Sequence, residues 1–183
     1  GSRGIIDRIK ELEHQGYQFE GADASLELLL RDAYGEVKET FSIDSFKIIL
    51  EKTSGRSVTE AIVKITVAGE QVYTVAEGNG PVNALDNALR KALVQHYPGI
   101  RDIHLTDYKV RVLDEKDATA AKVRVLIEST NFKDTWSTVG VSSNVIDASW
   151  EALIDSIRYA LMGMTKDADI VPELVQTNGL VNH

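Results

Sequence analysis

The residue types that most often carry out enzyme chemistry are few and scattered in this sequence. The four histidines, His14, His96, His104 and His183, share no metal-binding spacing such as H-x-H or H-E-x-x-H. The chain contains no cysteine, which excludes a disulfide framework and a cysteine-ligated zinc site. No serine lies in the G-x-S-x-G turn of a nucleophile elbow. The sequence therefore predicts no catalytic residue, no metal site and no cofactor held by this chain.

One loop, Glu77-Gly78-Asn79-Gly80-Pro81, has the composition of a binding site. Glycines allow successive backbone N–H groups to point toward one position, and a helix that starts at Pro81 adds the positive end of its dipole. Such a loop can hold a carboxylate or a phosphate. The alternative is an ordinary strand-to-helix turn that needs glycine for its backbone angles. Spacing alone favours the ordinary turn, because a single G-x-G is a weak match to phosphate-binding motifs.

The elements that position this loop follow from the period of the hydrophobic residues. Alternation and helical spacing predict three strands and a helix in each half, at residues 45–51, 60–67, 71–76 and 81–97, then at 103–112, 121–129, 135–141 and from Asn144 onward. Thr74 aligns with Thr138 and Ala88 with Ala152 at the same offset, and Asn144 is a suitable helix cap. We therefore expect an α+β fold built from a duplicated βββα unit, with antiparallel strands and with helices packed on one face.

Two segments flank the duplicated region. Residues 3–40 predict two short helices joined around Gly16, an arm that cannot bury both of its faces alone and must pack against something else. Residues 41–165 form the predicted domain, and 166–183, with little periodicity, predict a solvated tail. Gly1-Ser2 has the form of a protease-cleavage remnant, so we expect a piece of a longer protein.

Composition excludes several classes of protein. With 183 residues the chain is too short for a (β/α)₈ barrel, which typically needs about 250. Its 28 acidic and 20 basic residues give a net charge of −8, which argues against a nucleic-acid partner. No apolar run approaches the roughly 18 residues of a membrane span. We expect a cytoplasmic globular protein.

Several strings of residues resemble one known family. Residues 77–85, Asp107-Tyr108, 135–140 and 148–152 resemble the allosteric domain of 2-isopropylmalate synthases and citramalate synthases. The resemblance runs from about residue 43 to 162, and residues 10–20 resemble the helical linker that precedes that domain. Residues 108–112 and 120–125 are closer to the citramalate synthase branch.

The resemblance implies a regulatory region of a larger enzyme. Family members condense acetyl-CoA with a 2-oxo acid, pyruvate for citramalate synthases, on a barrel that requires a divalent metal and is not part of this chain. The domain that this chain resembles dimerises and binds the end product of the pathway. The implied partners are therefore a second copy, isoleucine (or leucine, for a 2-isopropylmalate synthase) and the catalytic barrel of the parent chain. The alternative is a purely structural dimerisation module without a ligand.

The resemblance also implies which residues bind the amino acid. The backbone N–H groups of Gly78, Asn79 and Gly80 would meet its carboxylate, and Asn83 or Asp107 would accept from its ammonium group. The remaining implied residues line or close the aliphatic pocket: Val82, Leu105, Tyr108 and Val112, with the turn Ser142-Ser143-Asn144 from the second unit. Ordinary core packing is the alternative role for Val82, Leu105 and Val112.

Overall fold

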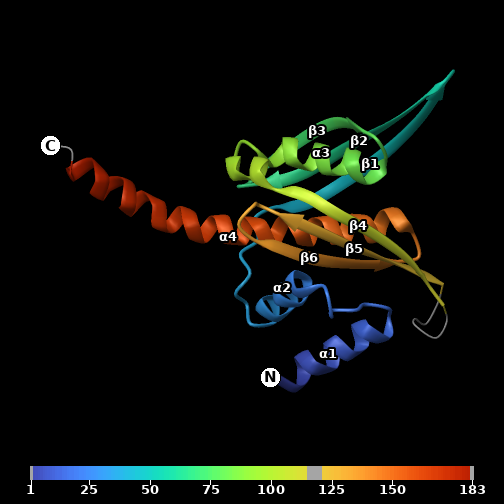
Figure 1. The fold of residues 1–183 in the computed structure, drawn as a ribbon, viewed down its shortest axis with the longest axis horizontal. Coiled ribbons are helices and arrows are strands. Elements are labelled where there is room, and N and C mark those ends of the chain that lie inside the picture. Colours follow the sequence, from blue (N-terminus) through green and yellow to red (C-terminus); the bar gives the residue numbers. More distant parts are fainter. Residues whose placement is uncertain (1, 115–120, 182–183) are drawn as a thin grey trace.

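The computed structural model describes residues 2–114 and 121–181, and its elements follow the predicted order (Figure 1). The arm consists of α1 (Ser2–His14) and α2 (Asp23–Ala33). The first unit contains β1 (Ser42–Thr53), β2 (Arg56–Val67), β3 (Glu70–Gly78) and α3 (Pro81–Leu93). After the 3₁₀ helix η1 (Pro98–Asp102), the second unit contains β4 (His104–Leu113), β5 (Lys122–Thr130), β6 (Thr135–Ser142) and α4 (Val145–Val181).

The duplicated βββα unit is confirmed, down to individual hydrogen bonds. Each unit has an antiparallel three-stranded sheet, in the orders β1-β2-β3 and β4-β5-β6. The Thr74 hydroxyl donates to the Ala88 carbonyl at 2.8 Å, and the Thr138 hydroxyl donates to the Ala152 carbonyl at 2.7 Å. The last strand of each unit is therefore tied to its helix in the same way.

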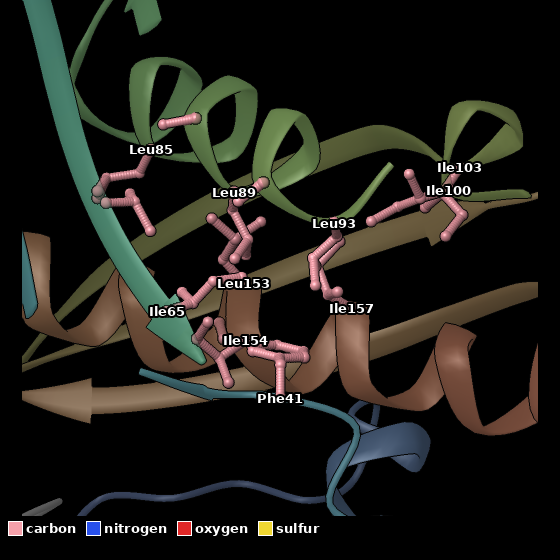
Figure 2. Close-up of a cluster of buried hydrophobic side chains, with 14 of the residues drawn as sticks. Phe41, Ile65, Leu85, Leu89, Leu93, Ile100, Ile103, Leu153, Ile154 and Ile157 are labelled. Atoms are coloured by element: carbon pink, nitrogen blue, oxygen red, sulfur yellow. The ribbon is translucent and has the colours of Figure 1, made fainter. Parts of the chain in front are cut away.

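The two units share one hydrophobic core. Helices α3 and α4 each pack on their own sheet and also contact each other. Figure 2 shows Leu89 beside Leu153 and Leu93 beside Ile157, and all four side chains are fully buried. Alanines on the sheet-facing side, such as Ala88 and Ala152, let each helix approach its strands closely.

The arm packs against the second unit, so its predicted partner is the rest of this chain. Leu12, Phe19 and Ala22 of the arm form a small cluster with Val139 on β6. The turn between α1 and α2 passes through Gly16, whose φ of 112° favours glycine. The Gly16 carbonyl accepts from Arg124 Nε of β5 at 2.8 Å, which fixes this turn to the sheet.

Residues 166–181, which the sequence predicts as a solvated tail, are helical in the structure. Helix α4 runs without interruption from Val145 to Val181 and projects from the body of the molecule (Figure 1). Extending an existing helix costs far less than starting one, so a helix that is already packed continues through a sequence of weak periodicity. Residues 182 and 183 lie outside the described residues. Within the described part of the chain, no helix is both long enough and apolar enough to cross a membrane.

Candidate functional site

The loop before α3 is closed by its own side chains. The Asn79 N–H donates to Asn83 Oδ1 at 3.0 Å, and Asn87 Nδ2 donates to the Glu77 carbonyl at 3.0 Å. A ligand carboxylate at the Asn79 N–H would therefore have to replace the Asn83 side chain as its acceptor. Gly80 precedes the first residue of α3, where no side chain caps the helix.

The two glycines of this loop differ in whether the structure requires them. A Cβ on Gly78 would lie 2.3 Å from the Ala84 nitrogen, so the strand can approach the helix only with glycine at that position. A Cβ on Gly80 would meet no atom within 4 Å, and its φ of −171° is an extended conformation open to any residue. The requirement for glycine at Gly78 is thus a close approach rather than an unusual turn.

A cavity of about 480 Å³ lies beside this loop. Its lining residues come from the start of β2 and from both sides of the loop: Arg56, Ser57, Val58, Glu77, Gly78, Asn79, Asn83 and Asn87. The size is within the range of small-molecule sites. A guanidinium group is suited to a carboxylate, and carboxylate and amide oxygens accept from an ammonium group. The lining therefore matches the two charged ends of an amino acid.

Arg56 is a candidate binding residue that the sequence analysis missed. It lies at the tip of the β1–β2 hairpin, next to Gly55, and no local motif distinguishes it from other surface arginines. Its relation to the loop depends on strand register, because Thr59 pairs with Gly78 and carries Arg56 past the end of β3. Arg56 and the loop before α3 therefore come together only when the β1–β2 hairpin has folded onto β3.

Tyr108, Val112 and the turn 142–144 lie near the start of α4 in the second unit. The Tyr108 and Ser149 hydroxyls are 2.7 Å apart. Val112 pairs with Val123, which pairs with Ser142, so these residues form one row across the sheet. The side chain of Val112 is 79% exposed.

Asn144 caps α4 as predicted, because its Oδ1 accepts from the Ile146 N–H at 2.7 Å. The Asn144 N–H in turn donates to Ser142 Oγ at 3.3 Å, so both residues shape the turn. Ser143 lies between them and is exposed.

Three predicted residues have roles that do not require a ligand. Leu105 is partly buried against the shared core, consistent with ordinary packing. Val82 is partly buried in the first turn of α3. Asp107 Oδ1 accepts from the Tyr108 N–H at 2.9 Å, and its Oδ2 lies 3.4 Å from Lys109 Nζ.

The structure does not bring the predicted site residues together in one pocket. Gly78, Asn79 and Asn83 line the cavity at the start of α3, and none of its lining residues comes from 105–112 or 142–144. Both helices begin at the end of the molecule where the β1–β2 and β4–β5 hairpins lie (Figure 1). Val112 and Ser142 lie at that end of the second sheet, whereas Leu105 pairs with Ser129 near its other end, so the predicted site residues do not share one cavity.

A second cavity, of about 510 Å³, lies between the arm and α4 and contains buried acids that the sequence analysis did not identify. Burial raises the pKa of Asp155 to about 6, although Ser25 donates to its carboxylate. Burial also raises the pKa of Glu151, which accepts from the Tyr17 hydroxyl and the Val141 N–H. Burial and the neighbouring Glu151 raise the pKa of Tyr17 well above its usual value. Among the described residues, no group of three acidic or histidine side chains is arranged to hold a metal ion.

Comparison with known proteins identifies the family. Residues 20–161 match the LeuA allosteric (dimerisation) domain, a span that includes α2, the first βββα unit and the second unit as far as residue 161 of α4. The chain belongs to this family. The match confirms the resemblance that the loop and strand motifs indicate.

The relatives of this chain include (R)-citramalate synthases and 2-isopropylmalate synthases. The chain is 53% identical over 160 residues to (R)-citramalate synthase from Aquifex aeolicus, covering 86% of this chain and 30% of the relative. It is 49% identical over 168 residues to (R)-citramalate synthase from Synechocystis sp., covering 89% and 31%. It is 29% identical over 160 residues to 2-isopropylmalate synthase from Aquifex aeolicus, covering 86% and 28%. The chain spans about 30% of the length of the curated relatives it matches.

Proposed function

We propose that this chain is the regulatory and dimerisation region of a citramalate synthase and that it binds isoleucine as a feedback inhibitor. The branch is supported by two relatives from one organism, Aquifex aeolicus. The chain is 53% identical to its (R)-citramalate synthase and 29% identical to its 2-isopropylmalate synthase. The parent enzyme would condense acetyl-CoA with pyruvate on a metal-dependent barrel, and isoleucine bound here would lower that activity.

The observation that carries the proposal is the lining of the cavity at the start of α3. Arg56 supplies a guanidinium group for the ligand carboxylate, while Glu77 and Asn83 supply oxygen acceptors for its ammonium group. These groups come from a hairpin tip, from the end of β3 and from the first turn of α3, so the fold positions them before a ligand arrives. An amino acid carries both charges that this lining would satisfy.

The aliphatic part of the site requires a second copy of the chain. Leu50 of β1 and Val112 of β4 occupy equivalent rows, which end at Gly78 and Ser142 respectively. Both side chains lie on the helix-facing side of their sheets but are 60% and 79% exposed, because the helix covers mainly the other two strands. We place the dimer contact on the exposed apolar surface that includes Leu50 and Val112, where a second copy would close the binding site.

A pocket of this kind separates isoleucine from leucine by shape. The two ligands have the same charges and volume, so only the fit of the branched side chain differs. Such differences are typically worth about 1–3 kcal/mol. Isoleucine should therefore bind roughly 5–150 times more tightly than leucine rather than exclusively.

A thermal-shift comparison with isoleucine, leucine and valine tests the proposal. Isoleucine at 100 times its dissociation constant should stabilise the fold by about 2.7 kcal/mol and raise the melting temperature. A shift with leucine alone would overturn the citramalate assignment. If none of the three amino acids changes the melting temperature at millimolar concentration, the chain is a structural dimerisation module instead.

A further inference from the structure

Asn79 differs from the other asparagines whose side chains the structure describes. In four of these five residues the side-chain amide makes hydrogen bonds: Asn83, Asn87, Asn131 and Asn144. Asn79 is exposed, and within the described part of the chain its side chain makes no hydrogen bond. The Asn79 amide is therefore free to rotate toward neighbouring backbone atoms.

The backbone N–H group that follows Asn79 is also free. The residue after Asn83 donates its N–H to the Gly80 carbonyl at 3.0 Å. The residue after Asn131 donates its N–H to Thr130 Oγ1 at 3.0 Å. The N–H of Gly80 donates to no described residue, and a Cβ at this position would meet no atom within 4 Å. An unhindered nitrogen thus lies next to an unrestrained side-chain amide.

We propose that Asn79 is a site of spontaneous deamidation in the folded chain, with water as the co-reactant. Hydroxide removes the proton from the Gly80 nitrogen, which then attacks Asn79 Cγ and forms a C–N bond. The Cγ–Nδ2 bond breaks, and the amide nitrogen leaves as ammonia after it takes a proton from water, which restores the hydroxide. Water then opens the five-membered succinimide at either of its carbonyl carbons, which leaves aspartate or isoaspartate at position 79.

The start of α3 favours the charged product over the neutral amide. Helix α3 begins at Pro81, and no side chain makes a cap hydrogen bond there. The N–H groups of a first helical turn carry partial positive charge, which stabilises a carboxylate nearby. Deamidation at position 79 therefore places a negative charge where the helix start stabilises it.

Deamidation would also change the cavity beside this loop, and its effect on isoleucine rests on the proposed function. Asn79 lines that cavity together with Arg56 and Glu77. A carboxylate at position 79 would compete with the ligand carboxylate for the Arg56 guanidinium group and would repel the ligand. We therefore expect the affinity for isoleucine to fall as the chain ages.

Peptide mapping by mass spectrometry tests the modification on the whole folded chain, aged at physiological temperature and slightly alkaline pH. Cleavage after Lys64 and Arg90 leaves Asn79, Asn83 and Asn87 on one peptide, so the three are compared directly. We expect conversion at Asn79, to a mixture of aspartate and isoaspartate, while the other two remain intact. The same chain unfolded in urea is the reference for the reactivity of an unrestrained Asn79.

Gly80→Ala tests the attacking nitrogen. The added methyl group meets no atom, so the variant should fold as the wild type does and deamidate several-fold more slowly. If Asn79 remains intact in the folded wild type but reacts in urea, the loop protects it and the proposal is overturned. Equal conversion at Asn83 or Asn87, or an unchanged rate in Gly80→Ala, also overturns it.

Calorimetric titration with isoleucine measures the consequence separately. Asn79→Asp carries the charge of the product, and we expect it to bind isoleucine at least about tenfold more weakly than the wild type. Asn131→Asp adds the same charge between β5 and β6, away from the cavity, and should bind as the wild type does. Equal binding by Asn79→Asp and the wild type would overturn the effect on the site. If the wild type binds no isoleucine, the proposed function is overturned, whereas the mass spectra still decide the deamidation.

Discussion

Gly78 and Gly80 lie two residues apart before α3, and the structure gives them different roles. Gly78 is held against the backbone of Ala84, whereas Gly80 has open space around its Cα. The sequence predicts both glycines as parts of one binding loop and does not distinguish them. Their difference arises from how closely β3 approaches the first turn of the helix.

Substitution by alanine separates the two positions. We expect Gly78→Ala to lower the free energy of unfolding by about 1–3 kcal/mol, because the helix start must shift to admit the methyl group. Gly80→Ala should change it by less than about 0.5 kcal/mol. Urea unfolding of both variants measures the difference. Equal effects would contradict the close approach at Gly78.

The raised pKa of Asp155 predicts how stability depends on pH. The pKa is about 6 in the folded chain and has its ordinary value of 3.8 in the unfolded chain, so the folded state binds more protons between these values. Stability from this group is therefore highest below about pH 4 and is lost as the pH rises through about 6. The loss is at most about 3 kcal/mol.

Asp155→Asn should remove this contribution, since an amide oxygen still accepts from Ser25 but does not ionise. We expect the variant to gain stability relative to the wild type as the pH rises from 4 to 7, measured by urea unfolding across that range. Asp134→Asn, an exposed aspartate in the β5–β6 hairpin, is the control. If the difference in free energy of unfolding between Asp155→Asn and the wild type is constant across this pH range, the raised pKa of the buried Asp155 carboxyl is contradicted.

At the scale of the elements, the repeat and its helix cap could be predicted and the docking could not. The offset between Thr74 and Thr138 is visible in the sequence, and each threonine bonds its own helix as the repeat requires. Tyr17 and Glu151 lie 134 residues apart, and no local pattern links them. Arg56 likewise reaches the loop only through the register of β2 with β3. Local hydrophobic periodicity determines which segments form helices and strands, whereas the packing of the folded chain determines which of their surfaces come into contact.

The cap of α4 gives a prediction at this scale. Asn144→Ala removes the acceptor of the Ile146 N–H and should cost about 1 kcal/mol of stability. Asn144→Asp, which keeps the acceptor, should restore most of it. Thermal unfolding monitored by circular dichroism measures both. An unchanged melting temperature in Asn144→Ala would show that the cap does not stabilise the helix.

At the scale of the whole molecule, the exposed apolar residues of β1 and β4 predict where two copies meet. Val112→Asp places a charge in the proposed contact and should weaken the dimer at least about tenfold, with the fold of each chain intact. Tyr73→Asp, an exposed position on the opposite face of the first sheet, is the matched control and should leave the dimer unchanged. Analytical ultracentrifugation over a range of concentrations measures both. The contact lies elsewhere if Tyr73→Asp dissociates the dimer and Val112→Asp does not.

Calorimetric titration of the whole chain with isoleucine is the most direct test that this domain is a sensor. The titration is done at two temperatures, because a binding enthalpy of zero at one temperature would otherwise be mistaken for no binding. We expect saturable binding of isoleucine, weaker binding of leucine, and a loss of about tenfold or more in Arg56→Gln, which removes a charged partner of the ligand carboxylate. Lys52→Gln, an exposed cation on the same hairpin, should bind as the wild type does. A folded, dimeric chain that gives no heat with millimolar isoleucine at either temperature would contradict the proposal.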